Sequence, residues 1–307
     1  MFSAEHEVYI WAKDELEAMQ AREKLKKNIM GNNANICVEV KYSRPLTAAD
    51  ILIVAVPSGV VPLVAEELSC FTKGCPLTIL SASKGLIQPG FKTISQVLQM
   101  KLPQCNVGVI SGPTIANEVM NLKPAKAVLA AQNVECLLRL KDVLQNNLLH
   151  FELSLNVKEV EFCASLKGII AIGAGIAEGL GHGKNFMGLL LTYGVQEILI
   201  IGNFLGISTG QILSIAGLGD LVATCLSGDS RNHRFGKLLA QKTSKETALK
   251  EVGMVVEGVR GAQDVKGLAV LNLSLPLIYS IDLVISKPTE ESLNNFVDTV
   301  LHYKGAL

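Results

Sequence analysis

The sequence predicts a two-part fold, in which an open, doubly wound α/β sheet of the Rossmann type occupies the first half and an all-helical part follows. Short apolar runs alternate with helix-forming segments up to about residue 157, and some of these runs are nearly continuous in Val and Ile. From about Glu159 onward helical patterns dominate. With 49% apolar and 18% charged residues in 307, the chain can bury two sizeable cores.

The first half carries the βαβ rhythm of a parallel sheet. Short runs rich in Val, Ile and Leu predict strands at residues 8–11, 51–56, 77–80 and 107–110. Helix-forming residues between them predict helices at 14–27, 59–68 and 91–100. We expect residues 1–157 to form a domain built on such a sheet.

The second half is expected to consist of helices alone. Amphipathic and apolar segments predict them at residues 160–180, 188–206, 209–215, 231–241, 259–271 and 290–302. We expect residues 158–307 to form a second, helical domain.

Charge and composition exclude several classes of protein. Lys plus Arg and Asp plus Glu both number 28, and no basic block occurs, which argues against a nucleic-acid or membrane-surface partner. The apolar stretches 168–177 and 198–207 are short and Gly-rich, so we expect no membrane insertion, and the N-terminus lacks the apolar core of a signal peptide.

The cysteines indicate a reducing compartment. Seven are present, an odd number, without CxxC or metal-ligand spacing. We expect small buried hydrophobes with free thiols, a cytoplasmic protein and no metal site.

Polar turns follow three of the predicted strands, at residues 56–59, 81–85 and 111–117. In open α/β sheets ligands bind at the carboxyl ends of the strands, so these turns are expected to line one crevice. Each turn alone is weak evidence, because loops rich in Ser, Gly and Pro are common, and Lys84 in such a loop is more often solvated than functional.

Lys167 interrupts a stretch that is otherwise apolar enough to be buried, residues 162–171. Burial lowers the pKa of a lysine, which makes it a candidate proton donor and acceptor. The alternative is a lysine that snorkels from the end of a helix. Asp220 is the candidate partner of Lys167.

The segments 217–221 and 230–236 place a carboxylate close to an anion site. Ser230 is a good N-cap for a helix from Arg231 to Ala240, so free backbone N–H groups and an arginine would face one small anion. A capped surface helix with solvated arginines is the alternative.

Taken together, these motifs resemble the bacterial NAD(P)-dependent glycerol-3-phosphate dehydrogenase family. The resemblance rests on Ala-Val-Pro-Ser at 55–58, Lys-Gly at 84–85, Ser-Gly-Pro-Thr at 111–114, Leu-Lys-Gly at 166–168, Gly-Leu-Gly-Asp-Leu at 217–221, Ser-Arg-Asn at 230–232, Arg-Phe-Gly at 234–236 and Val-Val-Glu-Gly-Val-Arg at 255–260. It implies an oxidoreductase that interconverts sn-glycerol 3-phosphate and dihydroxyacetone phosphate with NAD or NADP and supplies phospholipid synthesis.

The resemblance implies that residues 1–157 form a truncated dinucleotide-binding domain and residues 158–307 a helical substrate and catalytic domain. It also implies roles for individual residues. Lys167 is the expected proton acceptor and donor. Substrate-binding positions are Lys84, Gly112, Thr114, Lys167, Asp220, Ser230, Arg231 and Asn232. Cofactor-binding positions are Lys13, Lys84, Ala116, Arg231, Val255 and Glu257. Lys13 stands where the family usually has Arg near the adenosine 2′-phosphate, which favours NADP, although Asp14 and Glu15 weaken this preference.

The chain departs from the family pattern at two places. The G-x-G-x-x-G turn that holds the cofactor's pyrophosphate is not found, and residues 1–8 resemble the end of the first helix and the start of the second strand. Loss of a central strand would expose ladder edges on two neighbours. Either the coding start lies upstream, which we favour because the remaining site is intact, or the chain is an inactive remnant. Tyr193 replaces a usual Arg.

Three functions therefore stay open. The leading one is the dehydrogenase. The second is a remnant that binds a sugar phosphate but no dinucleotide, and cofactor affinity separates these two. A hydroxyacid or ketopantoate reductase shares the architecture but does not predict this anion site together with Lys84. The sequence does not settle whether the helical half forms a homodimer.

Overall fold

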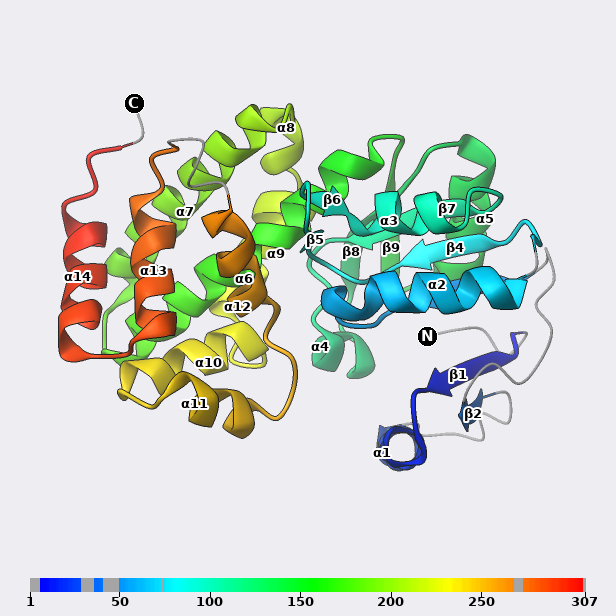
Figure 1. The fold of residues 1–307 in the computed structure, drawn as a ribbon, viewed down its shortest axis with the longest axis horizontal. Coiled ribbons are helices and arrows are strands. Elements are labelled where there is room, and N and C mark those ends of the chain that lie inside the picture. The colour runs from blue at the N-terminus through cyan, green and yellow to red at the C-terminus, as the bar shows by residue number, and fades with distance from the viewer. Residues whose placement is uncertain (1–5, 29–35, 41–49, 73, 268–272, 306–307) are drawn as a thin grey trace.

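The computed structural model describes residues 6–28, 36–40, 50–72, 74–267 and 273–305. In Figure 1 a sheet covered by helices occupies one side of the molecule, and a group of packed helices occupies the other side. This confirms the predicted class, a Rossmann-like α/β part followed by a helical part. β9 ends at Ser154 and α6 begins at Val157, while the division into domains at residue 157 stays a prediction. Two expectations fall partly outside the described residues. They are the resemblance of residues 1–8 to the end of a first helix, of which 1–5 are not described, and the helix at 259–271, of which 268–271 are not described.

The main sheet has five strands in the order β3-β4-β7-β8-β9. Their bounds are β3 Ile51–Val54, β4 Thr78–Ser81, β7 Asn106–Ser111, β8 Ala125–Ala131 and β9 Leu149–Ser154. β3, β4 and β7 are parallel, as expected, with Val54 opposite Ser81 and Ser81 opposite Val109. β8 runs antiparallel to β7, so the sheet is mixed. The register brings the ends of β3, β4 and β7 to the same edge.

A second, two-stranded sheet lies beside the first. β1 Val8–Ala12 pairs in parallel with β2 Ile36–Val40, and α1 Glu15–Asn28 connects them. In the described part of the chain these two strands are hydrogen-bonded only to each other. The ladder is therefore interrupted between β1 and β3, where the sequence predicted exposed strand edges.

Helices cover both faces of the main sheet. α2 Val61–Thr72 and α3 Ile94–Lys101 share one core with β3, β4 and β7. α5 Val134–Leu144 shares a second core with β8 and β9. The smaller elements here are a 3₁₀ turn Ser58–Val60, the hairpin strands β5 Leu86–Ile87 and β6 Lys92–Thr93, and α4 Ala116–Met120. Cores on both faces define the doubly wound arrangement.

The helical half is arranged around α6. Its helices are α6 Val157–Gly179, α7 Lys184–Phe204, α8 Thr209–Ile212, α9 Asp220–Leu226, α10 Arg231–Ala240, α11 Lys245–Val252, α12 Glu257–Lys266, α13 Pro276–Ser286 and α14 Glu290–Leu301. α6 packs against α7, α9, α10, α12 and α13. An apolar helix with so many neighbours is expected to be buried all round.

Glycines let the backbones around α6 approach closely. A Cβ atom on Gly236 of α10 would lie 2.1 Å from the carbonyl oxygen of Ile172, and one on Gly175 would lie 2.0 Å from the carbonyl oxygen of His233. Gly258 at the start of α12 would similarly meet the carbonyl oxygen of Gly168 at 2.4 Å. These distances leave no space for a side chain, so α10 and α12 are fixed against the central helix.

Three helices are long and apolar enough to cross a membrane by length and composition: Val157–Gly179, Lys184–Phe204 and Thr209–Leu226. The expectation that the apolar stretches are too short is therefore wrong, because residues 168–177 lie within α6 and residues 198–204 form the end of α7. Each helix contains an apolar segment of 18 residues. In α6, 94% of this segment is buried inside the protein, whereas in α7 only 44% is buried. Packing therefore accounts for the apolar character of α6.

All seven cysteines are free thiols, as predicted. Cys105, Cys136, Cys163 and Cys225 are buried. Cys75 is only partly buried and meets the expectation that all the cysteines are small buried residues only in part. Cys37 and Cys70 are exposed, so the expectation is wrong for these two. Both lie on the outside of the α/β half, in β2 and α2.

We predict that Gly236→Ala destabilises the protein by about 1–3 kcal/mol, because the added methyl group has no space between α10 and α6. The matched control is Gly188→Ala in α7, where nothing lies within 4 Å of the added Cβ. That substitution should stabilise the helix by about 0.5–1 kcal/mol. Urea unfolding of both variants measures the difference, and equal stabilities would contradict the close approach.

Candidate functional site

The polar turns that follow β3, β4 and β7 lie at one edge of the sheet, as predicted. The backbone N–H of Ala82 donates to the carbonyl oxygen of Val54, and the Ser83 hydroxyl donates to that of Val56 at 2.6 Å. These bonds join the turn after β4 to the turn after β3. They fix the backbone on both sides of Lys84, which extends from this edge towards the helical half.

Asp220 lies opposite this edge, at the start of α9. The chain enters α9 through a π-helical turn, Ile215–Gly219, and such turns are frequent at functional sites. The Asp220 side chain is only 4% exposed. The Thr224 hydroxyl donates to the Asp220 carbonyl oxygen at 2.6 Å. A buried carboxylate requires positive partners, since an isolated buried charge is costly.

Two lysines share one oxygen of this carboxylate. The ammonium of Lys167, on α6, lies 2.5 Å from Oδ2 of Asp220, and the ammonium of Lys84 lies 3.0 Å from the same atom. The Lys167 side chain is 12% exposed. The structure thus confirms the predicted partnership of Lys167 and Asp220. It also adds Lys84, for which the resemblance implied substrate and cofactor contacts but no contact with Asp220.

The cluster changes the proton affinity of its members. Burial lowers the pKa of Lys167, the charge of Lys84 lowers it further and Asp220 opposes both, so that the pKa is about 7. Burial alone would raise the pKa of Asp220, but Lys84 and Lys167 outweigh burial and hold that pKa below its usual range. Lys167 can therefore exchange a proton near neutral pH while Asp220 stays charged.

The predicted anion site is a capped helix start. Ser230 is the N-cap of α10 Arg231–Ala240, and its hydroxyl accepts from the backbone N–H of His233 at 3.3 Å. This confirms the predicted helix and its cap. The first N–H groups of a helix have no partner within it, so α10 presents donors and a partial positive charge here.

The start of α10 lies beside Lys167. A Cβ on Gly168, the residue after Lys167, would lie 3.0 Å from Nδ2 of Asn232. The Asn232 side chain also accepts from the backbone N–H of Gly258 at 2.9 Å. Arg231 donates to the carbonyl oxygen of Val255 at 3.1 Å. Predicted substrate and cofactor positions are therefore neighbours in this part of the fold.

Glu257 makes a contact that the sequence analysis missed. The backbone N–H of Ser58 donates to its Oε1 at 3.0 Å, and the Ser58 hydroxyl donates to its Oε2 at 2.7 Å. The motif Ala-Val-Pro-Ser drew attention to Ser58. It could not indicate Glu257 as the partner of Ser58, because the two residues are 199 positions apart in the sequence.

His233 is a second residue that sequence reasoning did not single out. It is buried in the first turn of α10, with Nε2 3.0 Å from a carboxylate oxygen of Glu178. Burial lowers the pKa of His233, and Glu178 opposes this. Neutral His233 adds no charge beside the anion site.

The remaining predicted residues are more dispersed. Gly112 and Thr114 follow β7 at the same edge, and the Thr114 hydroxyl donates to the carbonyl oxygen of Gly112 at 3.2 Å. Ala116 is exposed at the start of α4. Lys13 follows β1, its side chain is 78% exposed, and its ammonium lies 3.8 Å from Asp14. The roles predicted for these residues stay predictions.

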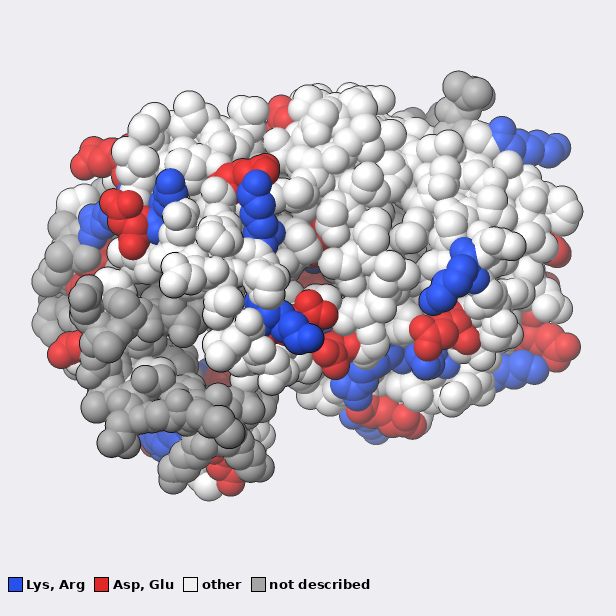
Figure 2. Space-filling model, turned by 180° about the vertical axis from the view of Figure 1, so that it is seen from behind, with Lys and Arg blue, Asp and Glu red and all other residues white. Residues whose placement is uncertain are grey.

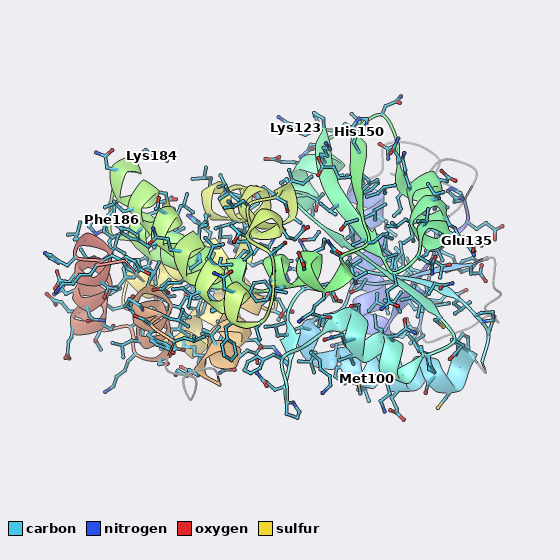
Figure 3. The ribbon with its side chains drawn as sticks, turned by 90° about the horizontal axis from the view of Figure 1, so that it is seen from above. Met100, Lys123, Glu135, His150, Lys184 and Phe186 are labelled. Carbon is cyan, nitrogen blue, oxygen red and sulfur yellow. The ribbon has the colours of Figure 1, made fainter. Side chains whose placement is uncertain are left out.

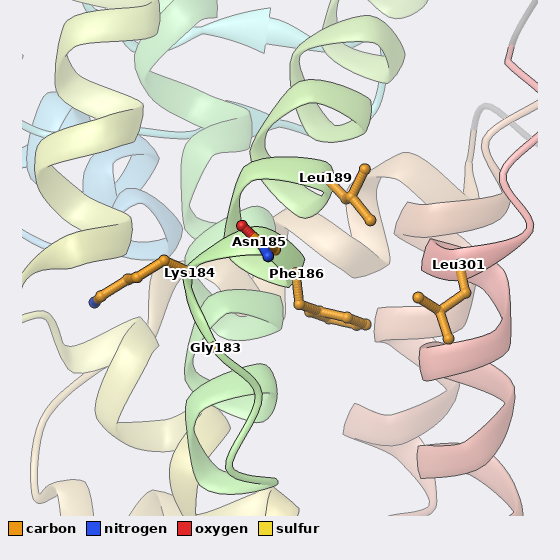
Figure 4. A pocket seen from close by; sticks show the side chains of 6 residues that line it. All are labelled: Gly183, Lys184, Asn185, Phe186, Leu189 and Leu301. Atoms are coloured by element: carbon orange, nitrogen blue, oxygen red, sulfur yellow. The ribbon is translucent and has the colours of Figure 1, made fainter.

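A hollow in the helical half lies apart from this site. It measures about 500 Å³ and is lined by Gly183, Lys184, Asn185, Phe186, Leu189 and Leu301 (Figure 4). Figure 3 shows Lys184 and Phe186 at the end of the helical half away from the sheet strands near Lys123 and His150. Lys184 is its one ionisable side chain, so the hollow lacks the opposed acid and base groups found at Asp220.

Metal-binding geometry is not found in the described residues, which hold no group of three or more His, Cys, Asp or Glu side chains that could bind an ion. On the face in Figure 2 basic and acidic side chains lie next to each other, and a broad area over the helical half carries neither. Among the described residues on this face, the basic side chains form no separate patch.

Comparisons with known proteins agree with the motifs. Residues 1–137 match the family model described as NAD-dependent glycerol-3-phosphate dehydrogenase N-terminus, and residues 156–294 match the model of its C-terminus. The chain is 33% identical over 301 residues to a glycerol-3-phosphate dehydrogenase (NAD(P)+) of Fusobacterium nucleatum, covering 95% of this chain and 90% of the relative. A Thermoanaerobacter enzyme of the same name is 34% identical over 283 residues, 90% of this chain and 85% of the relative.

A solved structure gives the same result. The crystal structure of glycerol-3-phosphate dehydrogenase from Coxiella burnetii superimposes with a TM-score of 0.84 at 25% identity, covering 96% of this chain and 91% of that chain. A glycerol-3-phosphate dehydrogenase structure from Dunaliella salina, at 24% identity and a TM-score of 0.80, covers 94% of this chain and 54% of that chain and shares the fold. The chain therefore belongs to the NAD-dependent glycerol-3-phosphate dehydrogenase family.

Proposed function

We propose that this chain interconverts dihydroxyacetone phosphate and sn-glycerol 3-phosphate with NAD(P)(H). The observation that carries the proposal is the position of Lys167 and Lys84 on the carboxylate of Asp220, beside the helix start at Ser230. This arrangement combines a group that exchanges protons near pH 7 with a site for a phosphate. The family membership supports the substrate and the cofactor.

Lys167 is the proposed acid and base. Reduction of a ketone adds a hydride at carbon and requires a proton at the oxygen as negative charge develops there. With a pKa of about 7, Lys167 can give that proton in reduction and take it back in oxidation. Asp220 holds the ammonium in place and remains a carboxylate throughout.

Lys84 is proposed to polarise the same oxygen. Two ammonium groups and one carboxylate leave one net positive charge in the cluster. This charge lies where the substrate oxygen becomes negative, in surroundings from which water is largely excluded. Electrostatic stabilisation is strongest under these conditions.

The phosphate of the substrate is proposed to bind at the start of α10. Ser230, Arg231 and Asn232 provide a hydroxyl, a guanidinium and an amide, and the helix start adds backbone donors. Arg231 is exposed and can turn towards an anion. Binding there would place the carbonyl group towards Lys167, because Asn232 lies against the next residue of α6.

The surface beside Arg231 fits the nicotinamide end of a dinucleotide. Met254 and Val255 expose about half of their side chains, 54% and 48%, next to this guanidinium. An apolar surface beside a cation suits a flat ring attached to a phosphate. When bound, the cofactor supplies or accepts the hydride. Val255 and Arg231 would orient the cofactor. The preference for NADP over NAD that Lys13 predicts is part of this proposal.

The competing functions make different predictions. A remnant that binds only a sugar phosphate would show no NADPH binding in a fluorescence titration. A hydroxyacid or ketopantoate reductase would prefer a ketoacid to dihydroxyacetone phosphate. The free thiols support a reducing, cytoplasmic location, where the product would supply phospholipid synthesis.

The helical half is also proposed to form a homodimer. α7 has an apolar window that is 44% buried in the protein, and Phe204 at its end is 50% exposed. Figure 2 shows a broad uncharged area over this half. A second copy of the chain would cover such a surface without introducing unpaired charge.

We predict that Lys167→Met reduces dihydroxyacetone phosphate reduction by at least about 100-fold, because the proton donor is lost. The fold should be retained, since Asp220 keeps Lys84 as its partner. In the wild type, reduction needs protonated Lys167 and should fall as pH rises through about 7, whereas oxidation should rise there. The NADPH absorbance at 340 nm follows both directions, because it falls in reduction of dihydroxyacetone phosphate and rises in oxidation of sn-glycerol 3-phosphate. Lys184→Met is the control, and full activity of Lys167→Met would refute the assignment.

Arg231→Ala should raise KM for dihydroxyacetone phosphate by about 10- to 150-fold, the equivalent of a charge-assisted phosphate contact worth about 1.5–3 kcal/mol. Arg234→Ala is the matched control, because Arg234 is exposed on the same helix one turn further along. Steady-state kinetics of both variants provide the test. An unchanged KM in Arg231→Ala would place the phosphate elsewhere.

Light scattering coupled to size exclusion should give twice the mass of the 32.9 kDa chain. Phe204→Glu should convert the protein to a monomer, because it places a charge on the apolar face of α7. Leu16→Glu, on the exposed side of α1, is the control and should remain a dimer. A monomeric wild-type protein at micromolar concentration would exclude this proposal.

A further inference from the structure

A serine–glutamate pair links the two halves of the molecule. Ser58, buried at the start of the 3₁₀ turn before α2, gives both its N–H and its hydroxyl to the carboxylate of Glu257, at 3.0 Å and 2.7 Å. Glu257 is the first residue of α12, which packs on α6. Both carboxylate oxygens therefore accept hydrogen bonds from one residue of the α/β half.

On one side, this pair is in contact with the turn that carries Lys84. Gly85 has φ +146°, and a Cβ there would lie 2.8 Å from the Cβ of Ser58. The backbone after Lys84 therefore rests directly on Ser58. On the preceding side of Lys84, the hydroxyl of Ser83 donates a hydrogen bond to the carbonyl oxygen of Val56, in the turn after β3. Lys84 is held between these two contacts.

On the other side, Gly258, the residue after Glu257, is in contact with Gly168, the residue after Lys167. A Cβ on Gly258 would lie 2.4 Å from the carbonyl oxygen of Gly168. The N–H of Gly258 is bonded to Asn232. A continuous series of contacts thus runs from Lys84 through Gly85, Ser58, Glu257, Gly258 and Gly168 to Lys167.

We propose that Ser58 and Glu257 are positioning residues that hold Lys84 and Lys167 at the separation at which both ammonium groups bind one oxygen of Asp220. The inference rests on the proposed function, because it concerns the same reaction. It assigns Ser58 a role, and it gives Glu257 a task besides the cofactor contact expected from the family pattern.

A physical consequence distinguishes this role from a purely structural one. Lys84 lowers the pKa of Lys167 by repulsion between the two positive charges. If the turn that carries Lys84 moves away, this repulsion weakens and the pKa of Lys167 rises. Among the described residues, the other ionisable groups that interact with Lys167 are Asp220 and the buried thiol of Cys225, both on α9. From α10 and α12, the uncharged amide of Asn232 and the backbone of Gly258 lie against Gly168, the next residue of α6.

The test compares Ser58→Ala with the control Ser208→Ala. The control also removes a serine–glutamate hydrogen bond, the one from Ser208 to Glu159 in the first turn of α6. The pKa of Lys167 is measured by NMR titration of ¹³C-lysine-labelled protein, with Lys167→Arg to assign the signal. The kcat of dihydroxyacetone phosphate reduction and the Kd of NADPH are measured beside it, and circular dichroism melting shows that each variant folds.

We expect Ser58→Ala to raise the pKa of Lys167 and to lower kcat about tenfold, while the Kd of NADPH changes less than about threefold. Ser208→Ala should change none of these. The conservative variant Glu257→Gln should keep a Lys167 pKa and a kcat close to those of the wild type. Its amide can accept from the Ser58 N–H and donate to the Ser58 hydroxyl. Glu257→Ala serves as the second disrupting variant where Ser58→Ala does not fold.

An unchanged pKa of Lys167 in both disrupting variants overturns the inference. A loss of NADPH affinity with kcat and pKa unchanged also overturns it, since Glu257 would then act only on the cofactor. The NMR titration needs no turnover. An inactive wild-type protein whose Lys167 pKa still responds to Ser58→Ala would therefore refute the proposed function and support the positioning role.

Discussion

The buried carboxylate of Asp220 is the interaction on which the arrangement of the two halves depends. It binds Lys84 from the sheet edge and Lys167 from α6, each within 3.0 Å of the same oxygen. Removing such charges from water is costly, so the buried carboxylate is stable only while it is paired with an ammonium group. Lys167 comes from the same half as Asp220, whereas Lys84 comes from the other half, so the second pair forms only in the assembled molecule.

Two further carboxylates of the helical half bind helix starts of the α/β half in the same way. Glu161 on α6 accepts from the N–H and the hydroxyl of Ser95 in the first turn of α3, as Glu257 does from Ser58. Helix starts favour negative charge, which makes these contacts directional. Burial raises the pKa of Glu161 from 4.5 to about 7, with the Ser95 hydrogen bonds opposing. These two bidentate contacts restrict sliding between the halves.

Local sequence was sufficient for much of the fold. The predicted strand at 107–110 and the cap at Ser230 agree with the structure because apolar runs and capping chemistry act over a few residues. β8 was missed because five of its seven residues are Ala or Lys, which carry little strand signal. α13 was missed because a nearly continuous apolar run hides the helical period. The Ser58–Glu257 contact joins residues 199 apart, which no local pattern reports.

The position of Lys167 shows why the close packing of α6 matters to chemistry. Its pKa depends on burial, on Lys84 and on Asp220. Burial is set by the helices around α6, and the two charges arrive from different elements across the junction. A shift of either half would change the distance to Lys84 and, through it, the proton affinity of Lys167. Glycines such as Gly168 and Gly258 fix that distance by letting backbones touch. The acid–base group is therefore a property of the assembled fold and not of Lys167 alone.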